Sequence, residues 1–142
     1  MKKPLSRAAV LLAIAATALV VGQTSAQASE SQCTAGQVCV WGENDYTGCF
    51  RGMTANGFDY STITWSTCSA KIDNGANSVK NEGRSCAVRL YTDANHSGSS
   101  ILFNREADGA NFRDPYLANG GGLGSANGLN WQDRISSHKF CP

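Results

Sequence analysis

Short segments in which apolar and polar residues alternate make up much of the chain after residue 28. In "AVRLY", Val88 and Leu90 fall on one side of an extended chain and Arg89 on the other, which is the period of a half-buried strand. Breakers rich in Gly, Asn and Asp separate these segments, and no stretch has apolar residues at helical spacing. The pattern predicts an all-β fold, an antiparallel sandwich or barrel, with strands within residues 37–41, 86–91, 100–103 and 135–140.

One long stretch interrupts this alternation. Residues 104–130 contain Pro115 and the glycine-rich run "GGGLGSANG" (120–128). The run lacks the lysine of a phosphate-binding loop and follows no predicted strand-to-helix turn. We predict a loop over residues 104–130, with room for one helical turn.

The first 28 residues have a different character. Three basic residues precede an apolar run over residues 8–21, and "SAQA" (25–28) provides a small-residue cleavage site. The run is short for a membrane span, so an uncleaved anchor is the weaker alternative. We predict a signal peptide over residues 1–28, a single mature domain over residues 29–142, and secretion to an extracellular location.

The charge balance of the mature chain argues against two classes of partner. The predicted leader holds three of the twelve basic residues, which leaves nine against eleven acidic ones. A chain without a basic surplus has no electrostatic footprint for a nucleic-acid backbone. No segment after the leader is apolar enough to cross a bilayer. We therefore expect no nucleic-acid partner and no membrane partner. We also expect the protein to be a monomer.

Six cysteines, an even number in a small exported chain, indicate three disulfides and no free thiol. Their spacing contains no C-x-x-C pair, and the chain has only two histidines, so a zinc site is not expected. The sequence leaves about fifteen pairings open. The cysteines are Cys33, Cys39, Cys49, Cys68, Cys86 and Cys141.

Motifs of catalysis are missing from the sequence. There is no H-E-x-x-H, no G-x-S-x-G and no P-loop lysine motif, so we do not expect an enzyme. His96 is expected to act as a structural ring and His138 as a packed or surface residue. The three tryptophans, Trp41, Trp65 and Trp131, are expected to serve packing rather than ligand stacking.

An internal repeat relates the two halves of the chain. "WGENDYTG" (41–48) and "YTDANHSG" (91–98) share the form aromatic-x-x-x-x-aromatic-x-Gly, with His96 in the second aromatic place of the later copy. Each copy predicts a folded hairpin in which glycine leaves room beneath a ring. Polar turns follow at "DNGANS" (73–78) and "QDRISS" (132–137), each before a strand-like stretch. Two similar four-strand units are predicted.

These motifs resemble those of the βγ-crystallins. The hairpins resemble the family's corner, Y/F/W-x-x-x-x-Y/F-x-G, and the polar turns its calcium motif, N/D-N/D-x-x-S/T-S. The first turn departs from the calcium motif at Asn77 and the second at Gln132. The segments "CTAGQVCVWGENDYTGC" and "DRISSHKFC" more closely resemble the secreted bacterial peptidase inhibitor family I36, whose members carry such a domain behind a signal peptide.

The resemblance implies a fold, a core and a disulfide. The fold is a two-sheet Greek-key sandwich of about eight strands, in which the last strand of each unit crosses into the other unit's sheet. Residues 135–141 would then lie beside residues 37–41, and Cys141 would bond to Cys33 or Cys39. The residues implied to face the core are Val38, Val40, Val79, Val88, Leu90 and Phe140.

For function, the resemblance implies an inhibitor of extracellular proteases, with metalloproteases as the expected targets and a secreted protease as the partner. An exposed loop held in an extended shape would bind the enzyme, and the candidates are residues 53–67, which end at Cys68, and residues 104–130. Two alternatives lack a protease target: a calcium-binding structural module, and a toxin-like or cell-surface binding protein.

No cofactor is required for inhibition, but the polar turns could bind calcium through oxygens of both turns and backbone carbonyls near Asn44 and Asp93. Each turn has lost one favoured ligand, so we expect an affinity of roughly 10⁻⁴–10⁻³ M or none. The turn over residues 132–137 keeps its hydroxyl and ranks first. Polar turns that satisfy only their own backbone are an equal alternative. The candidate ligands are Asp73, Asn74, Ser78, Gln132, Asp133, Ser136 and Ser137.

Overall fold

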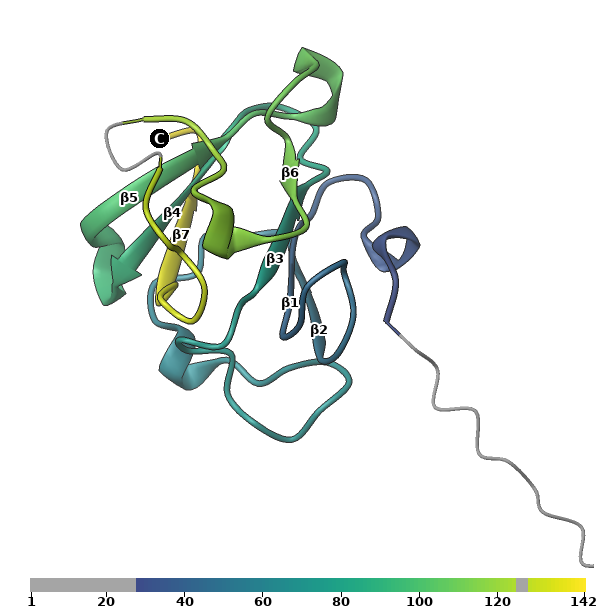
Figure 1. Cartoon of the computed structure of the whole chain (residues 1–142), viewed down its shortest axis with the longest axis vertical. Coiled ribbons are helices and arrows are strands. Elements are labelled where there is room, and N and C mark those ends of the chain that lie inside the picture. Colours follow the sequence, from purple (N-terminus) through teal and green to yellow (C-terminus); the bar gives the residue numbers. More distant parts are fainter. Residues whose placement is uncertain (1–27, 125–127) are drawn as a thin grey trace, which may run out of the picture.

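Two antiparallel β-sheets pack face to face in the computed structural model, which describes residues 28–124 and 128–142 (Figure 1). One sheet has the strand order β2-β1-β3-β6 and the other β5-β4-β7. The all-β, two-sheet prediction is confirmed, with seven strands among the described residues where about eight were expected. The strands are β1 (Val38–Trp41), β2 (Phe50–Met53), β3 (Ser78–Asn81), β4 (Val88–Asp93), β5 (Ser97–Phe103), β6 (Arg113–Asp114) and β7 (Ser137–Phe140).

Single turns of 3₁₀-helix lie before β1 and in the connections between the strands. They are η1 (Glu30–Gln32), η2 (Tyr60–Thr62), η3 (Ala94–His96), η4 (Glu106–Asp108) and η5 (Leu117–Asn119). The predicted signal peptide falls outside the described residues except for Ala28.

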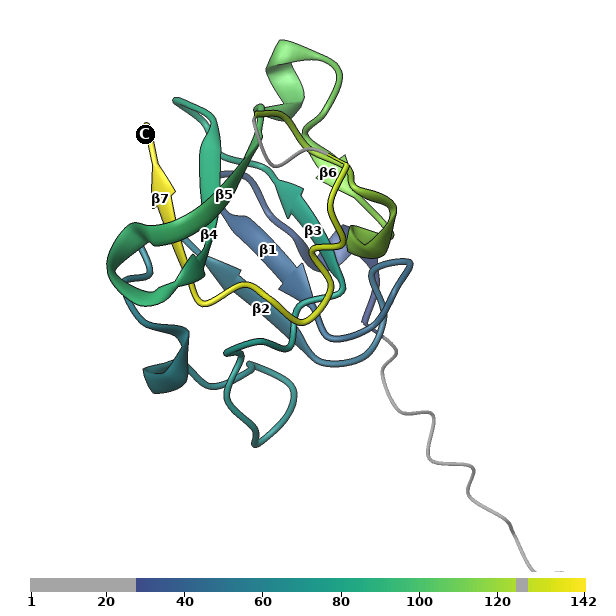
Figure 2. The same cartoon turned by 60° about the vertical axis from the view of Figure 1, so that its left-hand side comes forward.

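Strand exchange joins the two halves, but through different segments from those expected. β7 pairs with β4 of its own half, so the prediction that residues 135–141 lie beside residues 37–41 is wrong. The third segment of each half crosses instead: β6 lies beside β3 and pairs with it (Figure 2), and Gly57 forms an antiparallel bridge with His138. β7 is held in its own half because the hydroxyl of Ser137 hydrogen-bonds to the folded hairpin that follows β4.

The main core lies between the sheets and contains the residues that alternate along the central strands. The expected core residues are confirmed, and Phe140 is the one that is only partly buried. Trp65 and Trp131 are buried in the same cluster. The fully buried members expected from sequence are Val38, Val40, Val79, Val88 and Leu90.

β1 is buried on both of its faces. Val38 and Val40 face the main core, while Cys39 and Trp41 belong to a smaller cluster on the other side. That cluster is closed by the N-terminal segment and the first hairpin through Ala28, Cys33 and Tyr46.

An ion-pair network attaches the N-terminal segment to this sheet. Lys80 of β3 lies 2.9 Å from the carboxylate of Glu30, and Arg113 of β6 pairs with the same carboxylate. Burial favours a raised pKa for Glu30, but the bonds from the two cations outweigh it and hold the pKa below its ordinary value. The pairs therefore help to keep the second face of β1 covered.

The two hairpin corners repeat almost the same backbone. Asp45 and Tyr46 have φ values of 54° and 59°, and their counterparts Asn95 and His96 both have 60°. The paired rings also recur, since Trp41 lies 5.1 Å from Tyr46 and Tyr91 lies 5.5 Å from His96, centroid to centroid. His96 thus occupies the place of the second aromatic ring in its corner.

The serine at the end of each polar turn joins that turn to its hairpin corner by two hydrogen bonds. Ser78 donates to the carbonyl of Glu43 at 2.8 Å and accepts from the backbone N–H of Tyr46 at 3.2 Å. Ser137 makes the equivalent two bonds to the second hairpin, at 2.6 and 3.1 Å. The polar turn and the hairpin of each half are therefore one hydrogen-bonded unit.

The glycines that end the corners take left-handed backbone conformations, with φ of 77° at Gly48 and 76° at Gly98. A Cβ at Gly48 would lie 2.6 Å from Cγ of Glu43, and one at Gly98 would lie 2.3 Å from Oγ1 of Thr92. The backbone conformation therefore requires these glycines, and the nearest obstructing atoms belong to Glu43, Thr92 and Asp93 rather than, as expected, to the corner rings.

Gly48→Ala should destabilise the protein by about 1–3 kcal/mol, because the new side chain meets both a strained φ and a close neighbour. Chemical unfolding monitored by tryptophan fluorescence would measure the loss. Gly42→Ala in the same hairpin is the matched control, since its nearest contact would be an ordinary 3.5 Å. Equal stability losses in the two variants would contradict the strained corner.

The segment over residues 104–130 is less of a free loop than expected. It contains η4, η5 and the short strand β6, where one helical turn was predicted. Leu117 is fully buried in the main core, and Asp114 is 3% exposed. Among the described residues of this segment, the turn around η4, residues 105–111, projects from the body of the sandwich (Figures 1 and 2).

All six cysteines form disulfides, as predicted. The pairs are Cys33–Cys39, Cys49–Cys68 and Cys86–Cys141. The expected bond from Cys141 to Cys33 or Cys39 is wrong, because Cys141 follows β7, and β7 lies next to the strand that Cys86 precedes.

Candidate functional site: an exposed loop anchored by a disulfide

The connection between β2 and β3, residues 54–77, is the longest between consecutive strands of the described residues, and only part of it is exposed. Gly57, Tyr60 and Trp65 are buried and attach the expected candidate, residues 53–67, to the body, while residues 54–56, 58, 61 and 62 before and between these anchors are exposed. Past Trp65 the chain emerges, and residues 66, 67 and 69–71 are exposed on both sides of Cys68. We call residues 64–71 the disulfide loop.

Both ends of the disulfide loop are fixed. Thr64 and Lys71 form an antiparallel bridge, and the backbone N–H of Trp65 donates to the carbonyl of Ala70 at 3.1 Å. Trp65 on one side and Ile72 on the other are buried in the main core. The loop therefore leaves and re-enters the body through two apolar anchors.

The tip of the loop is tied to β2. The Cys49–Cys68 disulfide links it to the residue before β2. Ser66 donates its backbone N–H to the carbonyl of Phe50 at 2.8 Å, and the hydroxyl of Thr67 accepts from the backbone N–H of Phe50 at 2.8 Å. An exposed peptide segment is thus held in one conformation by covalent and backbone bonds, which lowers the ordering cost of binding.

The chemistry of the tip is neutral and small. Its exposed side chains come from Ser, Thr, Ala and a single cation, Lys71. The ammonium of Lys71 donates to the carbonyl of Thr62 at 3.0 Å and to the hydroxyl of Thr64 at 3.2 Å, so it braces the base of the loop. Such a tip suits a narrow cleft that receives a peptide backbone with small side chains.

The turn over residues 105–111 is the other exposed candidate. An ion pair between Arg105 and Asp108 and a 2.9 Å bond from the N–H of Asn104 to the carbonyl of Asn111 hold it. It lies at the opposite end of the sandwich from the disulfide loop in both views (Figures 1 and 2). An interface of ordinary area with a protease would include one of these two ends and not both.

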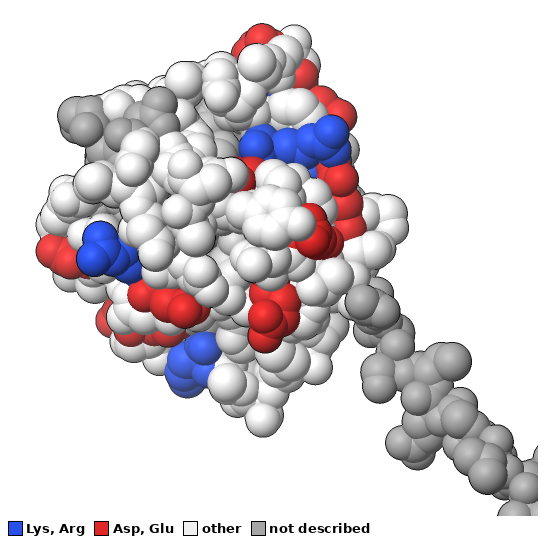
Figure 3. Space-filling view, in the orientation of Figure 1, with Lys and Arg blue, Asp and Glu red and all other residues white. Residues whose placement is uncertain are grey.

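The distribution of charged side chains does not mark a binding surface on the face of the molecule drawn in Figure 3. Figure 3 shows acidic and basic groups among large uncharged areas, without an extended patch of one sign. The described residues contain no group of three or more His, Cys, Asp or Glu side chains placed to hold a metal ion.

The predicted calcium ligands divide into three groups. Ser78 and Ser137 are fully buried, and their hydroxyls are used in the hydrogen bonds to the two hairpin corners. The carbonyl of Asp93, one of the expected ligands, accepts from Ser137. Asp133 is exposed, and the structure shows no side-chain bond of Gln132 among the described residues.

The remaining three ligands come together where the polar turns touch. Ser136 donates to Oδ1 of Asn74 at 3.3 Å, and the amide of Asn74 donates to Oδ2 of Asp73 at 3.1 Å. The other carboxylate oxygen of Asp73 is buried without a partner, as is Oδ1 of Asn77. Unpaired buried oxygens of this kind are available to a hard cation.

His138 is a buried structural residue. Its Nε2 lies 2.8 Å from the carbonyl of Ala55, which can only accept, so Nε2 carries the proton and Nδ1 accepts from the hydroxyl of Tyr60 at 2.9 Å. Burial lowers the pKa of His138 to about 4 and raises that of Tyr60. The pair links the connection after β2 to β7.

Comparison with solved structures places this architecture in a known class. A βγ-crystallin from Ciona intestinalis superposes with a TM-score of 0.53 at 16% identity, covering 74% of this chain and 99% of that one. A βγ-crystallin from an archaeon gives a TM-score of 0.50 at 15% identity, covering 75% and 99%. The fold is that of a βγ-crystallin domain.

The family is narrower than the fold. The model of the peptidase inhibitor family I36 matches residues 26–103, more than half of the chain, and the protein belongs to that family. The matched range contains the disulfide loop and ends before the turn over residues 105–111. No curated protein matches the sequence at a significant level.

Membership of a peptidase inhibitor family and three disulfides favour an inhibitory role and an extracellular location. Within the described residues, no helix has the length and apolar character needed to span a bilayer.

Proposed function

We propose that the mature chain, residues 29–142, is a secreted monomeric inhibitor of extracellular metalloproteases, and that the disulfide loop enters the active-site cleft of its target. The observation that supports this most is the rigid exposure of residues 66–71 on two core anchors, a disulfide and backbone bonds to Phe50. An inhibitor binds tightly when the bound conformation exists before binding.

The disulfide loop is favoured over the turn at residues 105–111 for two reasons. The family match covers the loop and not the turn, so an inhibitory segment shared by the family falls within residues 26–103. The turn is closed by a surface ion pair without a covalent bond, and surface ion pairs contribute little rigidity.

A protease panel tests the proposal. Titration of purified mature protein against secreted zinc metalloproteases and serine proteases should show stoichiometric, slowly dissociating inhibition of at least one metalloprotease and weaker inhibition of serine proteases. Light scattering of the complex should show one inhibitor per enzyme. If nothing in the panel is inhibited at micromolar concentration, a binding module without a protease target replaces this function.

A second candidate, weak calcium binding, is favoured by the unpaired oxygens of Asp73 and Asn77. We propose that a calcium ion would take oxygens from Asp73, Asn74 and Ser136, where the two turns meet. This shifts the preferred site towards the turn over residues 73–78, because the retained hydroxyl of Ser136 points to Asn74 rather than into its own turn. One carboxylate in the cluster keeps the expected affinity near that of extracellular modules.

Adding 10 mM calcium should stabilise the wild-type protein by about 1.4 kcal/mol if the dissociation constant is about 1 mM. Thermal unfolding with calcium against chelator would measure it. Asp73→Ala should abolish the effect, while Asp133→Ala, a matched loss of an exposed carboxylate in the other turn, should retain it. Retention in Asp73→Ala would contradict the site, and no effect in the wild type would leave the turns purely structural.

A further inference from the structure

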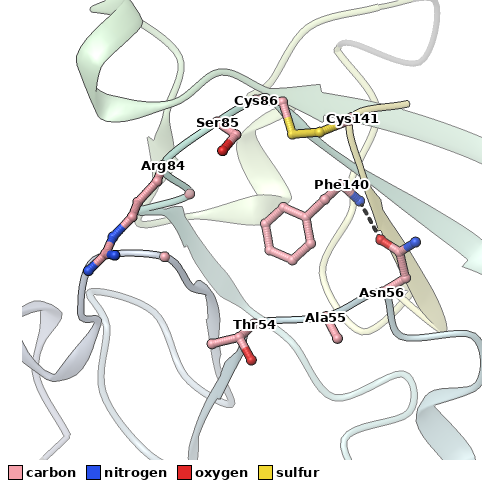
Figure 4. A pocket seen from close by; sticks show the side chains of 10 residues that line it. Thr54, Ala55, Asn56, Arg84, Ser85, Cys86, Phe140 and Cys141 are labelled. Carbon is pink, nitrogen blue, oxygen red and sulfur yellow. Dashed lines mark hydrogen bonds between the residues drawn. A yellow bond between two sulfur atoms is a disulfide. The ribbon is translucent and has the colours of Figure 1, made fainter.

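A pocket of about 460 Å³ opens at the end of the sandwich away from the disulfide loop. Its walls come from four segments that are distant in sequence: Gly36, residues 54–56, residues 83–86 and residues 140–141 (Figure 4). β2 runs from one site to the other, since Phe50 contacts the disulfide loop and Met53 leads directly into Thr54. The volume lies within the range of small-molecule sites.

The pocket combines an aromatic surface with one positive charge. The ring of Phe140 projects into it, with Ser85 above and Thr54 and Ala55 below, and Arg84 lies on the far side of the gap with its side chain running along that wall (Figure 4). None of the described residues that line the pocket is Asp or Glu. Among the residues that the structure describes, Arg84 has no ion-pair partner, so its guanidinium is available.

The wall that carries Arg84 is held from behind. The fully buried side chain of Asn81 accepts from the N–H of Gly83 at 2.9 Å and donates to the carbonyl of Asn104 at 2.9 Å. The carbonyl of Arg84 itself accepts from the guanidinium of Arg105 at 3.0 Å. The backbone under Arg84 is therefore fixed although its side chain is exposed.

The opposite wall is fixed as well. The Cys86–Cys141 disulfide closes one side, and the N–H of Phe140 donates to the side chain of Asn56 at 2.8 Å. The inner side of Phe140 packs on the main core. A pocket with rigid walls keeps its shape without a ligand, which lowers the cost of filling it.

We propose that this pocket binds a carboxylate attached to an apolar group, preferably an aromatic one. Arg84 would bind the carboxylate through its planar pair of donors, and the apolar group would stack on Phe140. Two sources offer this chemistry: the C-terminal residue of a peptide, and a free aromatic acid. The site does not depend on protease inhibition, because it lies at the other end of β2.

NMR titration of the ¹⁵N-labelled mature protein with N-acetyl-phenylalanine tests the site. The amide signals of residues 83–86 and Asn56 should shift, with a dissociation constant in the order of 1 mM for a ligand of this size. N-acetyl-phenylalaninamide, which lacks the carboxylate, should bind at least tenfold more weakly. Equal binding of the acid and the amide, or no shift with either, would overturn the proposal.

Arg84→Gln should weaken binding of N-acetyl-phenylalanine at least tenfold. Arg134→Gln, which removes the same charge from an exposed position outside the pocket, should leave binding unchanged. The fold of both variants can be checked from the same spectra. Wild-type affinity in Arg84→Gln would overturn the assignment of the guanidinium.

Two further experiments distinguish a peptide C-terminus from a free acid, and carboxylate binding from protease inhibition. Tighter binding of Gly-Gly-Phe than of 3-phenylpropionate would identify a peptide C-terminus, and the reverse order a free acid; both orders support the carboxylate site. Saturating N-acetyl-phenylalanine should leave inhibition of a sensitive protease unchanged. Competition between them would overturn the separation of the two sites.

Discussion

Loss of the Cys49–Cys68 disulfide should raise the inhibition constant against a sensitive protease by about 100-fold. A disulfide that closes a loop of this length contributes about 3 kcal/mol to order, and much of that ordering would have to occur on binding once the bond is absent. About 2.8 kcal/mol corresponds to a factor of 100 in affinity. Steady-state inhibition by the Cys49→Ser/Cys68→Ser variant gives the measurement.

The matched control is Cys86→Ser/Cys141→Ser. This pair closes a longer segment, with a sequence separation of 55 against 19, so its loss should cost at least as much stability. It lies at the far end of β2, and inhibition should stay within about threefold of wild type. Equal loss of inhibition in both variants would show that only global stability was changed and that the disulfide loop is not the inhibitory segment.

Acidification from pH 6.5 to pH 4 should reduce the free energy of unfolding by roughly 3 kcal/mol through His138 alone. Its pKa is about 4 in the folded protein against 6.5 for an ordinary histidine, so the unfolded chain binds more protons in this window. The stability is fully present above pH 6.5 and is lost as the pH falls towards 4. The main physical cause is desolvation, because the second ring proton would place a positive charge in a buried site, and that proton would also displace the bond that the Tyr60 hydroxyl donates to Nδ1.

Denaturant unfolding at several pH values would measure this slope, and ¹³C NMR of the imidazole would give the midpoint directly. His138→Phe is the comparison variant, because a phenyl ring can pack against Tyr60 and Phe140 without titrating. Its stability should be lower at pH 7 but should fall by about 3 kcal/mol less between pH 6.5 and pH 4. A wild-type slope in His138→Phe would show that other groups cause the acid sensitivity.

Much of the fold could be predicted because its signals are local. Alternation at Val88 and Leu90 and the repeated aromatic-glycine corners are properties of a few neighbouring residues, and the corner backbone depends on glycine at positions 48 and 98. The crossing strand was assigned wrongly for the same reason. The local pattern predicts a strand over residues 137–140. Its neighbours are determined by the hydrogen bond from Ser137 to the second hairpin and by the bridge to Gly57, which lies some eighty residues earlier.

The candidate site shows the same division. The cysteines, the two corners and the family's motifs can be read from sequence, but the expected candidate, residues 53–67, stopped before Cys68 and so left out half of the disulfide loop; the run of small residues on both sides of Cys68 is the signal that could have extended it. The candidate began at residue 53 because nothing local shows that Gly57, Tyr60 and Trp65 turn inward, and it shares only residues 64–67 with the disulfide loop. The same holds for the Arg84–Phe140 pocket, whose four wall segments are brought together only by the packed sheets.

By itself, the sequence determined a disulfide-bonded, all-β protein with two repeated hairpins and an inhibitor-family resemblance, since composition, periodicity and corner glycines act over short distances. Only the tertiary structure decided which cysteines pair, which segments cross between sheets, and which part of each long connection is exposed. Those outcomes depend on burial and on hydrogen bonds between residues far apart in the chain, such as Ser66 with Phe50 and His138 with Ala55.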